Sequence, residues 1–313
     1  MIGIVGTGSA AKRIYQILKE INNDLQISFY SNTRNYFFLN KKKIFTKALK
    51  FKKKNFNENI FFIANNSSEH FKYLQYFIRK QKNIYVEKPI CTSSREAKKV
   101  IILYKNFRKN LTVGYQFREN ESLKFLFNII KKNINKIVSV SAYSGEDVKK
   151  YHKNEDYKKS YTVNKEKGGG VLLTQIHQID YLSFLFGKVI KVKAIQKKTD
   201  KKLHANVETN VSYLLKTKNN ILINCNLNYF SKKLNLINIY LTDGIIIWNN
   251  ELNSVIIKKK KKLKFLFNQN RHQMFYQRIS NFLKNLNKKR NINSFKEDLN
   301  SIFVVDQIKK DIS

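Results

Sequence analysis

The sequence predicts an α/β protein with a doubly wound parallel sheet followed by a second domain on a mostly antiparallel sheet. At the N-terminus, a glycine-rich turn joins an apolar strand to an amphipathic helix. Apolar runs without alternation then alternate with helical patterns as far as Gly114, which is typical of parallel sheets. Beyond Gly187, apolar and polar residues alternate with the period of half-buried antiparallel strands.

Length and composition restrict the class of protein. The chain has 313 residues, of which 42% are hydrophobic, so it can form a sizeable core and about two domains. Its two cysteines, Cys91 and Cys225, exclude a disulfide framework and a cysteine-rich metal site. No apolar run reaches the roughly 18 residues of a membrane span, and MIGIVGTGSA lacks a charged leader. We expect a soluble cytoplasmic protein with no membrane partner and no bound metal.

The formal net charge of +39 raises nucleic acid or an anionic membrane as a partner. However, only nine of the 61 basic residues are arginine, and Lys, Asn, Ile, Phe and Tyr, which have A/T-rich codons, crowd the chain. Glycine occurs ten times and proline once. We therefore interpret the charge mainly as a mutational bias and expect no specific nucleic-acid partner. A dinucleotide-binding regulator with nucleic-acid affinity remains the non-enzymatic alternative.

The glycine-rich turn predicts a dinucleotide site. An apolar strand at Met1–Val5 precedes the turn, and a helix with Ile14, Ile17 and Leu18 on one face follows it. The first glycine permits a tight turn, the second lets the backbone approach a pyrophosphate, and Ala11 keeps the helix close to the strand. The helix N-terminus offers free N–H groups to the phosphates. The expected contacts are Gly6, Thr7, Gly8, Ser9 and Ala10.

The residues after the second expected strand, Leu25–Tyr30, indicate whether the site prefers NAD or NADP. An NAD site places a carboxylate there for the ribose hydroxyls, but none occurs in Ser31-Asn32-Thr33-Arg34. Ser31 and Arg34 instead suit a 2′-phosphate, with a hydroxyl donor and a planar cation. The sequence thus predicts NADP in preference to NAD; the alternative is an ordinary surface turn.

Two further buried strands, Ile60–Ala64 and Asn83–Val86, are expected to end at the ligand crevice. Asn65, Asn66 and His70 follow the first of them and are candidate cofactor contacts. The second runs into Glu87, Lys88 and the only proline, Pro89. We expect Glu87 and Lys88 beside the nicotinamide. The other elements expected here are helices at Phe71–Lys82 and Ser94–Phe107 and a strand at Leu111–Gly114.

A second candidate group follows the glycine cluster Gly168–Gly170. Val171–Phe186 has helical periodicity, which would put Thr174, His177 and Asp180 on one face. A helix histidine beside a carboxylate can transfer a proton. The alternative is a structural histidine bonded to a nearby carbonyl.

The remaining chain predicts the second domain. The polar segment 146–167 is expected to be a long substrate-side loop, and Lys258–Lys262 a solvated hairpin or loop. We expect terminal helices at Arg271–Leu286 and Lys296–Lys309. Strands are expected at Val138–Tyr143, Val189–Ala194, Val207–Leu215, Ile221–Tyr229, Leu236–Leu241 and Ile245–Trp248. An antiparallel sheet with one open face is commonly an interface, so we expect a homodimer or homotetramer through it.

Several motifs in order resemble the Gfo/Idh/MocA oxidoreductases, the family of glucose–fructose oxidoreductase and inositol dehydrogenase. They are GTGSAA at Gly6–Ala11, NNSSEH at Asn65–His70, EKP at Glu87–Pro89, VGYQFRENESLKFL at Val113–Leu126 and GGGVLLTQIHQIDYLSFLFG at Gly168–Gly187. The resemblance covers almost the whole chain. It implies a Rossmann domain at residues 1–118 and an α/β substrate-binding and dimerisation domain with a large, open, mostly antiparallel sheet at 119–313.

The resemblance also implies hydride transfer between NAD(P) and a sugar or polyol, with Lys88 and His177 in the chemistry. Asp180 would bind substrate or orient His177, and Gln116, Arg118, Tyr161 and Thr174 are candidate substrate contacts. Many relatives carry an aspartate where this chain has Thr174, which puts an Asp–His relay in doubt. The stretch Glu155–Tyr161 resembles relatives associated with nonulosonic-acid and other surface-polysaccharide pathways. An imine or tetrapyrrole reductase is the enzymatic alternative.

Overall fold

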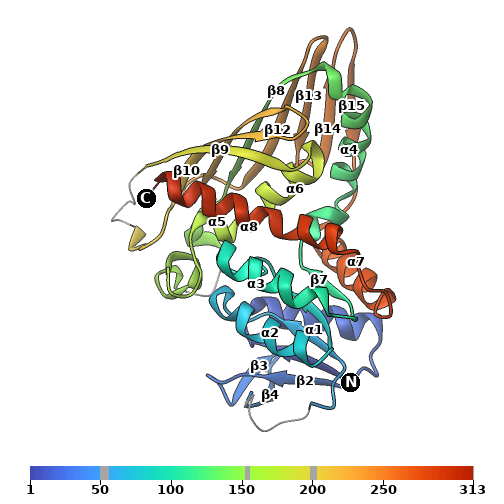
Figure 1. The fold of residues 1–313 in the computed structure, drawn as a ribbon, viewed down its shortest axis with the longest axis vertical. Coiled ribbons are helices and arrows are strands. Elements are labelled where there is room, and N and C mark those ends of the chain that lie inside the picture. Colours follow the sequence, from blue (N-terminus) through green and yellow to red (C-terminus); the bar gives the residue numbers. More distant parts are fainter. Residues whose placement is uncertain (50–55, 152–155, 198–202, 313) are drawn as a thin grey trace. The chain divides into compact units, whose positions relative to one another are not determined.

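The computed structural model describes residues 1–49, 56–151, 156–197 and 203–312 in two compact units (Figure 1). The N-terminal unit comprises Met1–Tyr115 and Phe275–Lys296, and the second unit comprises Gln116–Met274 and Glu297–Ser313. The chain therefore passes between the units three residues before the expected boundary at 118. It also returns to the N-terminal unit near its end, which the sequence did not predict.

The N-terminal unit is built on a seven-stranded sheet in the order β3-β4-β2-β1-β5-β6-β7. All neighbouring strands are parallel except β3 and β4. The order reverses at β1, which makes the sheet doubly wound, as predicted. The strands are β1 (Ile2–Val5), β2 (Ile27–Tyr30), β3 (Tyr36–Leu39), β4 (Lys42–Lys47), β5 (Ile60–Ile63), β6 (Asn83–Val86) and β7 (Leu111–Val113).

Burial of apolar faces holds the helices of this unit to the sheet. The helix α1 (Ser9–Ile21) buries Ala11, Ile14, Ile17 and Leu18, which share the face expected from their spacing. The other helices are α2 (His70–Arg79), α3 (Ser94–Lys105) and α7 (Arg271–Lys284). Phe275, Ile279 and Phe282 of α7 join the same core as α1. Helix α7, from late in the chain, thus completes the core of the N-terminal unit.

The sequence did not predict the hairpin of β3 and β4. β3 lies in the connection between the parallel strands β2 and β4, where such a sheet usually has a helical crossover. Phe37 of β3 is buried against Phe29 of β2, with ring centroids 4.8 Å apart. Tyr36, Phe38 and Phe45 on the opposite face of the hairpin are exposed.

The second unit is built on an eight-stranded sheet in the order β15-β14-β13-β12-β8-β11-β10-β9. Only the pair β8 and β11 is parallel, so the sheet is mostly antiparallel, as expected. The strands are β8 (Ile137–Gly145), β9 (Val189–Gln196), β10 (Asn210–Thr217), β11 (Leu222–Asn228), β12 (Leu234–Leu241), β13 (Gly244–Asn249), β14 (Ser254–Lys258) and β15 (Lys262–Leu266). The five lysines at 258–262 span the turn between β14 and β15.

Helices cover one face of this large sheet (Figure 1). The other face carries exposed side chains. The covering helices include α4 (Glu121–Asn133), α5 (Val171–Thr174) and α6 (His177–Phe186). In β10, Val211, Tyr213 and Leu215 are buried, whereas the alternating Ser212 and Leu214 are exposed. In the last helix, α8 (Ile292–Ile312), the run 298–302 is buried, and so are Val304, Val305 and Ile308. The unit thus has a helix-covered core and an open sheet face.

Candidate functional site

The turn after β1 has the backbone that a bound pyrophosphate requires. Gly6 has φ +113°, and a Cβ there would lie 2.6 Å from the carbonyl oxygen of Ala64, so only glycine fits. Gly8 begins α1 as its N-cap, and a Cβ on it would meet open space. The backbone at Gly8 can therefore be approached closely by a ligand, as a dinucleotide site needs.

The N-terminus of α1 is electrostatically suited to an anion. No side chain caps this terminus, and its first turn holds no acidic residue. The first intrahelical bond is from Lys12 N–H to the Gly8 carbonyl, at 3.0 Å, so the preceding N–H groups are available to phosphate oxygens. Thr7 is buried, Ala10 is half-buried and Ser9 is exposed. These residues fit the pyrophosphate of a dinucleotide.

The turn after β2 presents Arg34. The Ser31 hydroxyl oxygen accepts the backbone N–H groups of Thr33 and Arg34, at 3.2 and 3.1 Å, and so shapes the turn. The Arg34 side chain is exposed, and no carboxylate stands in this turn. Ser31 thus acts on the backbone, while Arg34 supplies the cation that could bind a 2′-phosphate.

His70 links the segments that follow β5 and β6. Its imidazole is buried, with Nδ1 2.7 Å from the Pro89 carbonyl oxygen and Nε2 3.1 Å from that of Asn65. Burial lowers the pKa of His70, although both carbonyl contacts oppose this effect. The imidazole ring therefore connects the loop that carries Asn65 to the loop that carries Lys88. These contacts of His70 are structural.

The β5 loop provides a further polar group. The Asn65 side-chain amide donates to Glu69 at 2.9 Å, while its Oδ1 atom is buried and has no hydrogen-bond partner within the described residues. Asn66 is exposed and is the N-cap of the short turn Ser67–Glu69. An unsatisfied buried acceptor at the carboxyl end of a strand is consistent with a site that receives a donor from a ligand.

Glu87 and Lys88 stand at the carboxyl end of β6. The Glu87 N–H donates to Ile63 at 2.9 Å and so extends the pairing of β5 and β6 by one residue. The Glu87 side chain is buried, and its Oε1 atom has no partner among the described residues. Lys88 is half-buried. The ladder thus fixes the backbone of Lys88 at the crevice edge of the sheet.

In the second unit, the expected single helix 171–186 is two helices, so this prediction was wrong. α5 ends at Thr174, and α6 begins at His177. Polar contacts of Gln175 explain the break, because its amide donates to the Tyr151 hydroxyl at 2.8 Å and to the Asn228 carbonyl at 3.1 Å. Thr174 and His177 are therefore not on one helical face.

Thr174 belongs to a buried hydroxyl network. Its hydroxyl donates to the Gly170 carbonyl at 2.9 Å or exchanges a hydrogen bond with the Tyr229 hydroxyl at 2.5 Å. Tyr229 can in turn donate to the Thr162 carbonyl, at 3.1 Å. Thr174 thus ties α5 to the sheet and to the segment after Ser160.

His177 is buried at the start of α6 and packs against Phe117, with ring centroids 5.1 Å apart. Asp180 follows three residues later on the same helix. Its two carboxylate oxygens accept from Nε and Nη2 of Arg118, at 3.0 and 2.6 Å. Arg118 also donates through Nη1 to Asp298 of α8. The structure thus brings Arg118 and Asp180 together and adds a second carboxylate that sequence reasoning missed.

The two remaining candidate substrate contacts are Gln116 and Tyr161. Gln116 is buried, and its Oε1 atom has no partner within the described part of the chain. Tyr161 is half-buried in a short 3₁₀ turn, Tyr161–Val163. The segment 146–167, expected to be a long substrate-side loop, has 3₁₀ turns at 148–150, 157–159 and 161–163 among its described residues. Glu155, from the motif 155–161, lies outside the described residues.

The glycines of the cluster Gly168–Gly170 allow close packing within the second unit. A Cβ on Gly169 would lie 2.2 Å from the Tyr161 carbonyl oxygen. Gly170 has φ +104°, and a Cβ there would lie 2.3 Å from the Glu208 carboxylate. Glu208 accepts the Leu172 N–H at 3.3 Å, so its carboxylate binds the N-terminus of α5. The glycines bring the backbone close to these groups.

Replacement of Glu208 by Gln should make the protein more stable at neutral pH. Burial raises the pKa of the Glu208 carboxyl above its ordinary value of 4.5. The folded protein therefore holds this proton more tightly than the unfolded chain, and stability falls as pH rises above 4.5. A Gln side chain accepts the same N–H without titrating. The melting temperature of wild type should fall relative to that of Glu208→Gln as pH increases. Glu166→Gln, at an exposed position, is the control, and parallel curves for wild type and Glu208→Gln would contradict the assignment.

Within the described residues, no group of three metal-ligating side chains is found. No helix among them is long and apolar enough to cross a membrane.

Comparisons with known proteins agree with this geometry. Residues 1–115 match the family described as "Oxidoreductase family, NAD-binding Rossmann fold", and residues 131–247 match the "GFO/IDH/MocA C-terminal domain". No curated protein sequence matches the chain. The two units and the glycine turn thus define an NAD(P)-dependent oxidoreductase. The chain belongs to the Gfo/Idh/MocA family.

Solved structures share the fold at low sequence identity. A levoglucosan dehydrogenase in complex with NADH and levoglucosan superposes with a TM-score of 0.81 at 14% identity, covering 99% of this chain and 96% of that one. An aldose-aldose oxidoreductase from Caulobacter crescentus gives 0.77 at 16%, covering 99% and 96%. A biliverdin reductase from Synechocystis sp. PCC 6803, in complex with biliverdin and NADP+, gives 0.73 at 15%, covering 99% and 98%.

Proposed function

We propose that this protein transfers a hydride between NADP and a hydroxyl or carbonyl carbon of a sugar or sugar derivative. The observation that carries the proposal is that one sheet holds both the glycine turn after β1 and Lys88 after the end of β6. The similarity to levoglucosan dehydrogenase and aldose-aldose oxidoreductase supports a sugar-type substrate. The nicotinamide supplies or accepts the hydride when it is bound.

The side chains of the protein must then remove or supply one proton. Oxidation of an alcohol removes the hydroxyl proton as the hydride leaves, and reduction of a carbonyl requires a proton for the forming alkoxide. We assign this transfer to Lys88. His177 holds the hydroxyl or relays the proton, while Gln116 and Tyr161 bind the substrate. The buried contacts of Thr174, Asp180 and Arg118 favour support of this site over direct chemistry.

A substrate screen tests the proposal. The protein is supplied with NADPH or NADP and with free sugars, nucleotide sugars and biliverdin, and the absorbance of the reduced nicotinamide is followed. We expect turnover with a sugar-type compound and its loss in Lys88→Ala. Turnover with biliverdin alone would assign the protein to tetrapyrrole reduction. No turnover, together with salt-dependent binding of DNA, would favour a regulator.

Arg34→Ala should weaken NADPH binding by about tenfold, because a charge-assisted bond to the 2′-phosphate is lost. NADH lacks that phosphate, so its dissociation constant should stay nearly unchanged. Fluorescence titration with both cofactors measures the two effects. Arg79→Ala removes an exposed arginine at the end of α2 and is the matched control. Equal losses for NADPH and NADH would count against NADP preference.

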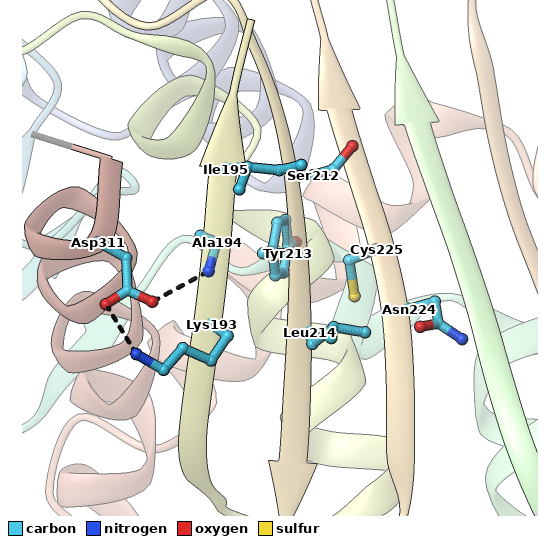
Figure 2. A pocket seen from close by; sticks show the side chains of 9 residues that line it. All are labelled: Lys193, Ala194, Ile195, Ser212, Tyr213, Leu214, Asn224, Cys225 and Asp311. Atoms are coloured by element: carbon cyan, nitrogen blue, oxygen red, sulfur yellow. Dashed lines mark hydrogen bonds and ion pairs between the residues drawn. The ribbon is translucent and has the colours of Figure 1, made fainter.

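We also propose that two copies associate through the open face of the large sheet. Ile195 and Leu214 on this face are 74% and 53% exposed. A shallow hollow of about 550 Å³ lies there, lined by residues of β9, β10 and β11 and by Asp311 (Figure 2). Asp311 accepts the Ala194 N–H at 3.0 Å, so the end of α8 borders the hollow.

Leu214→Arg should shift the protein to monomers, because it places a charge in the proposed apolar interface. Light scattering coupled to size-exclusion chromatography gives the molar mass. Ile102→Arg is the control, since Ile102 is an exposed apolar residue on α3. A wild-type protein that is already monomeric would refute this interface.

A further inference from the structure

Arg118 lies between two buried carboxylates that belong to different helices. Nε and Nη2 donate to Asp180 of α6, and Nη1 donates to Asp298 of α8. The side chains of Asp180 and Asp298 are 2% and 0% exposed, and that of Arg118 is 17% exposed. Three separate elements, which are the turn 116–119, α6 and α8, therefore meet at one guanidinium.

The planar shape of the guanidinium makes this junction directional. Two parallel N–H groups fit the two oxygens of Asp180, which sets the plane of the fork relative to α6. Asp298 accepts a hydrogen bond from Nη1, a third nitrogen of the same rigid guanidinium. Removal of Asp298 would free the fork to rotate or shift, although the bidentate pair with Asp180 remains. Asp298 is thus placed to determine where Arg118 holds the turn 116–119.

The same turn carries the aromatic ring that packs on His177. Phe117 precedes Arg118 in the chain, and its ring centroid is 5.1 Å from that of His177 and 5.7 Å from that of Tyr181. Asp180 lies three residues after His177 on α6. The turn therefore holds this end of α6 at two adjacent points, by Phe117 on the imidazole and by Arg118 on the carboxylate.

We infer that Asp298 is a positioning residue for His177, acting through Arg118 and the turn that carries Phe117. The inference rests on the proposed function only in assigning His177 to proton handling. Asp298 itself touches the guanidinium and needs no contact with substrate or cofactor. Its loss should displace the Phe117 ring relative to the imidazole and slow the chemical step.

Nuclear magnetic resonance of the full-length protein with labelled histidines tests the positioning directly. A ring at 5.1 Å imposes a ring-current shift on the His177 signal. His177→Gln identifies that signal, and Phe117→Leu shows where it moves without the ring. In Asp298→Asn we expect the signal to move from the wild-type position towards that of Phe117→Leu. A general loss of stability would not shift it in molecules that remain folded.

Kinetics with the substrate found in the screen provide the second measurement. A small displacement of a reacting group can reduce turnover by about 10- to 100-fold, so kcat of Asp298→Asn should fall within this range. NADPH affinity, which depends on the N-terminal unit, should be unchanged. Glu297→Gln alters the adjacent, exposed carboxylate and should change neither the signal nor kcat. Asp298→Glu restores the charge and should recover part of both effects.

The possible outcomes separate the inference from the proposed function. A wild-type His177 signal in folded Asp298→Asn would overturn the positioning role, whatever the substrate. A moved signal with unchanged kcat would refute its importance for the reaction. If no substrate is found, the signal still decides the positioning role. Should Asp298→Asn not fold, Arg118→Lys, which keeps the charge but loses the fork, must move the signal for the inference to hold.

Discussion

Lys88→Ala should lower kcat by about 100-fold or more while NADPH binding stays nearly intact. The substitution removes the proposed proton donor and acceptor but leaves the glycine turn and the N-terminus of α1 unchanged. Lys88 follows Glu87, whose N–H remains paired to Ile63, so the strand end should keep its position. Steady-state rates and cofactor fluorescence titration give the two quantities.

Lys98→Ala is the matched control, because Lys98 is an exposed lysine on the adjacent helix α3. Its rate should equal that of wild type. Near-normal turnover of Lys88→Ala would remove Lys88 from the mechanism. A parallel loss of NADPH affinity would instead assign it to cofactor binding.

Arg118→Leu should reduce the free energy of unfolding by about 3–5 kcal/mol, which is the cost of leaving buried charges without their partner. Two carboxylates, Asp180 and Asp298, would remain enclosed with no guanidinium between them. Urea denaturation at neutral pH measures the loss. Arg79→Leu, at an exposed position, should change stability by only a few tenths of a kcal/mol.

A triple variant identifies the cause of that loss. Arg118→Leu combined with Asp180→Asn and Asp298→Asn removes the two carboxylate charges that lost the guanidinium and should regain part of the stability. If the triple variant is as unstable as the three single losses added together, the effect comes from packing rather than from charge.

The sequence predicted the N-terminal unit well because local patterns determine it. β1, β5 and β6 are short apolar runs, and Gly6 and Gly8 stand where the backbone requires them. The hairpin of β3 and β4 was missed because the run 36–47 lacks a distinct turn signal. Its turn is Asn40-Lys41, both with positive φ, and Lys41 is unusual at such a position.

In the second unit, the spacing of apolar residues was not enough to predict the helices correctly. Residues 171–186 are mostly apolar, so a continuous helix fits their pattern, but the contacts of Gln175 with Tyr151 and Asn228 interrupt it. These partners are distant in sequence and cannot be inferred from local spacing. Asp298 was missed for the same reason, since it lies 180 residues from Arg118. The available signal was an aspartate directly before Leu299, which is buried in α8.

The hairpin also has a consequence for how the protein behaves at high concentration. β3 is an edge strand whose outer face carries the exposed Tyr36 and Phe38, and such edges promote strand-to-strand aggregation. Lys43 places its ammonium group 4.2 Å from the Tyr36 ring centroid and 5.2 Å from that of Phe45. An approaching strand would have to desolvate this charge. Lys43 therefore opposes the pairing of a further strand with this aromatic edge.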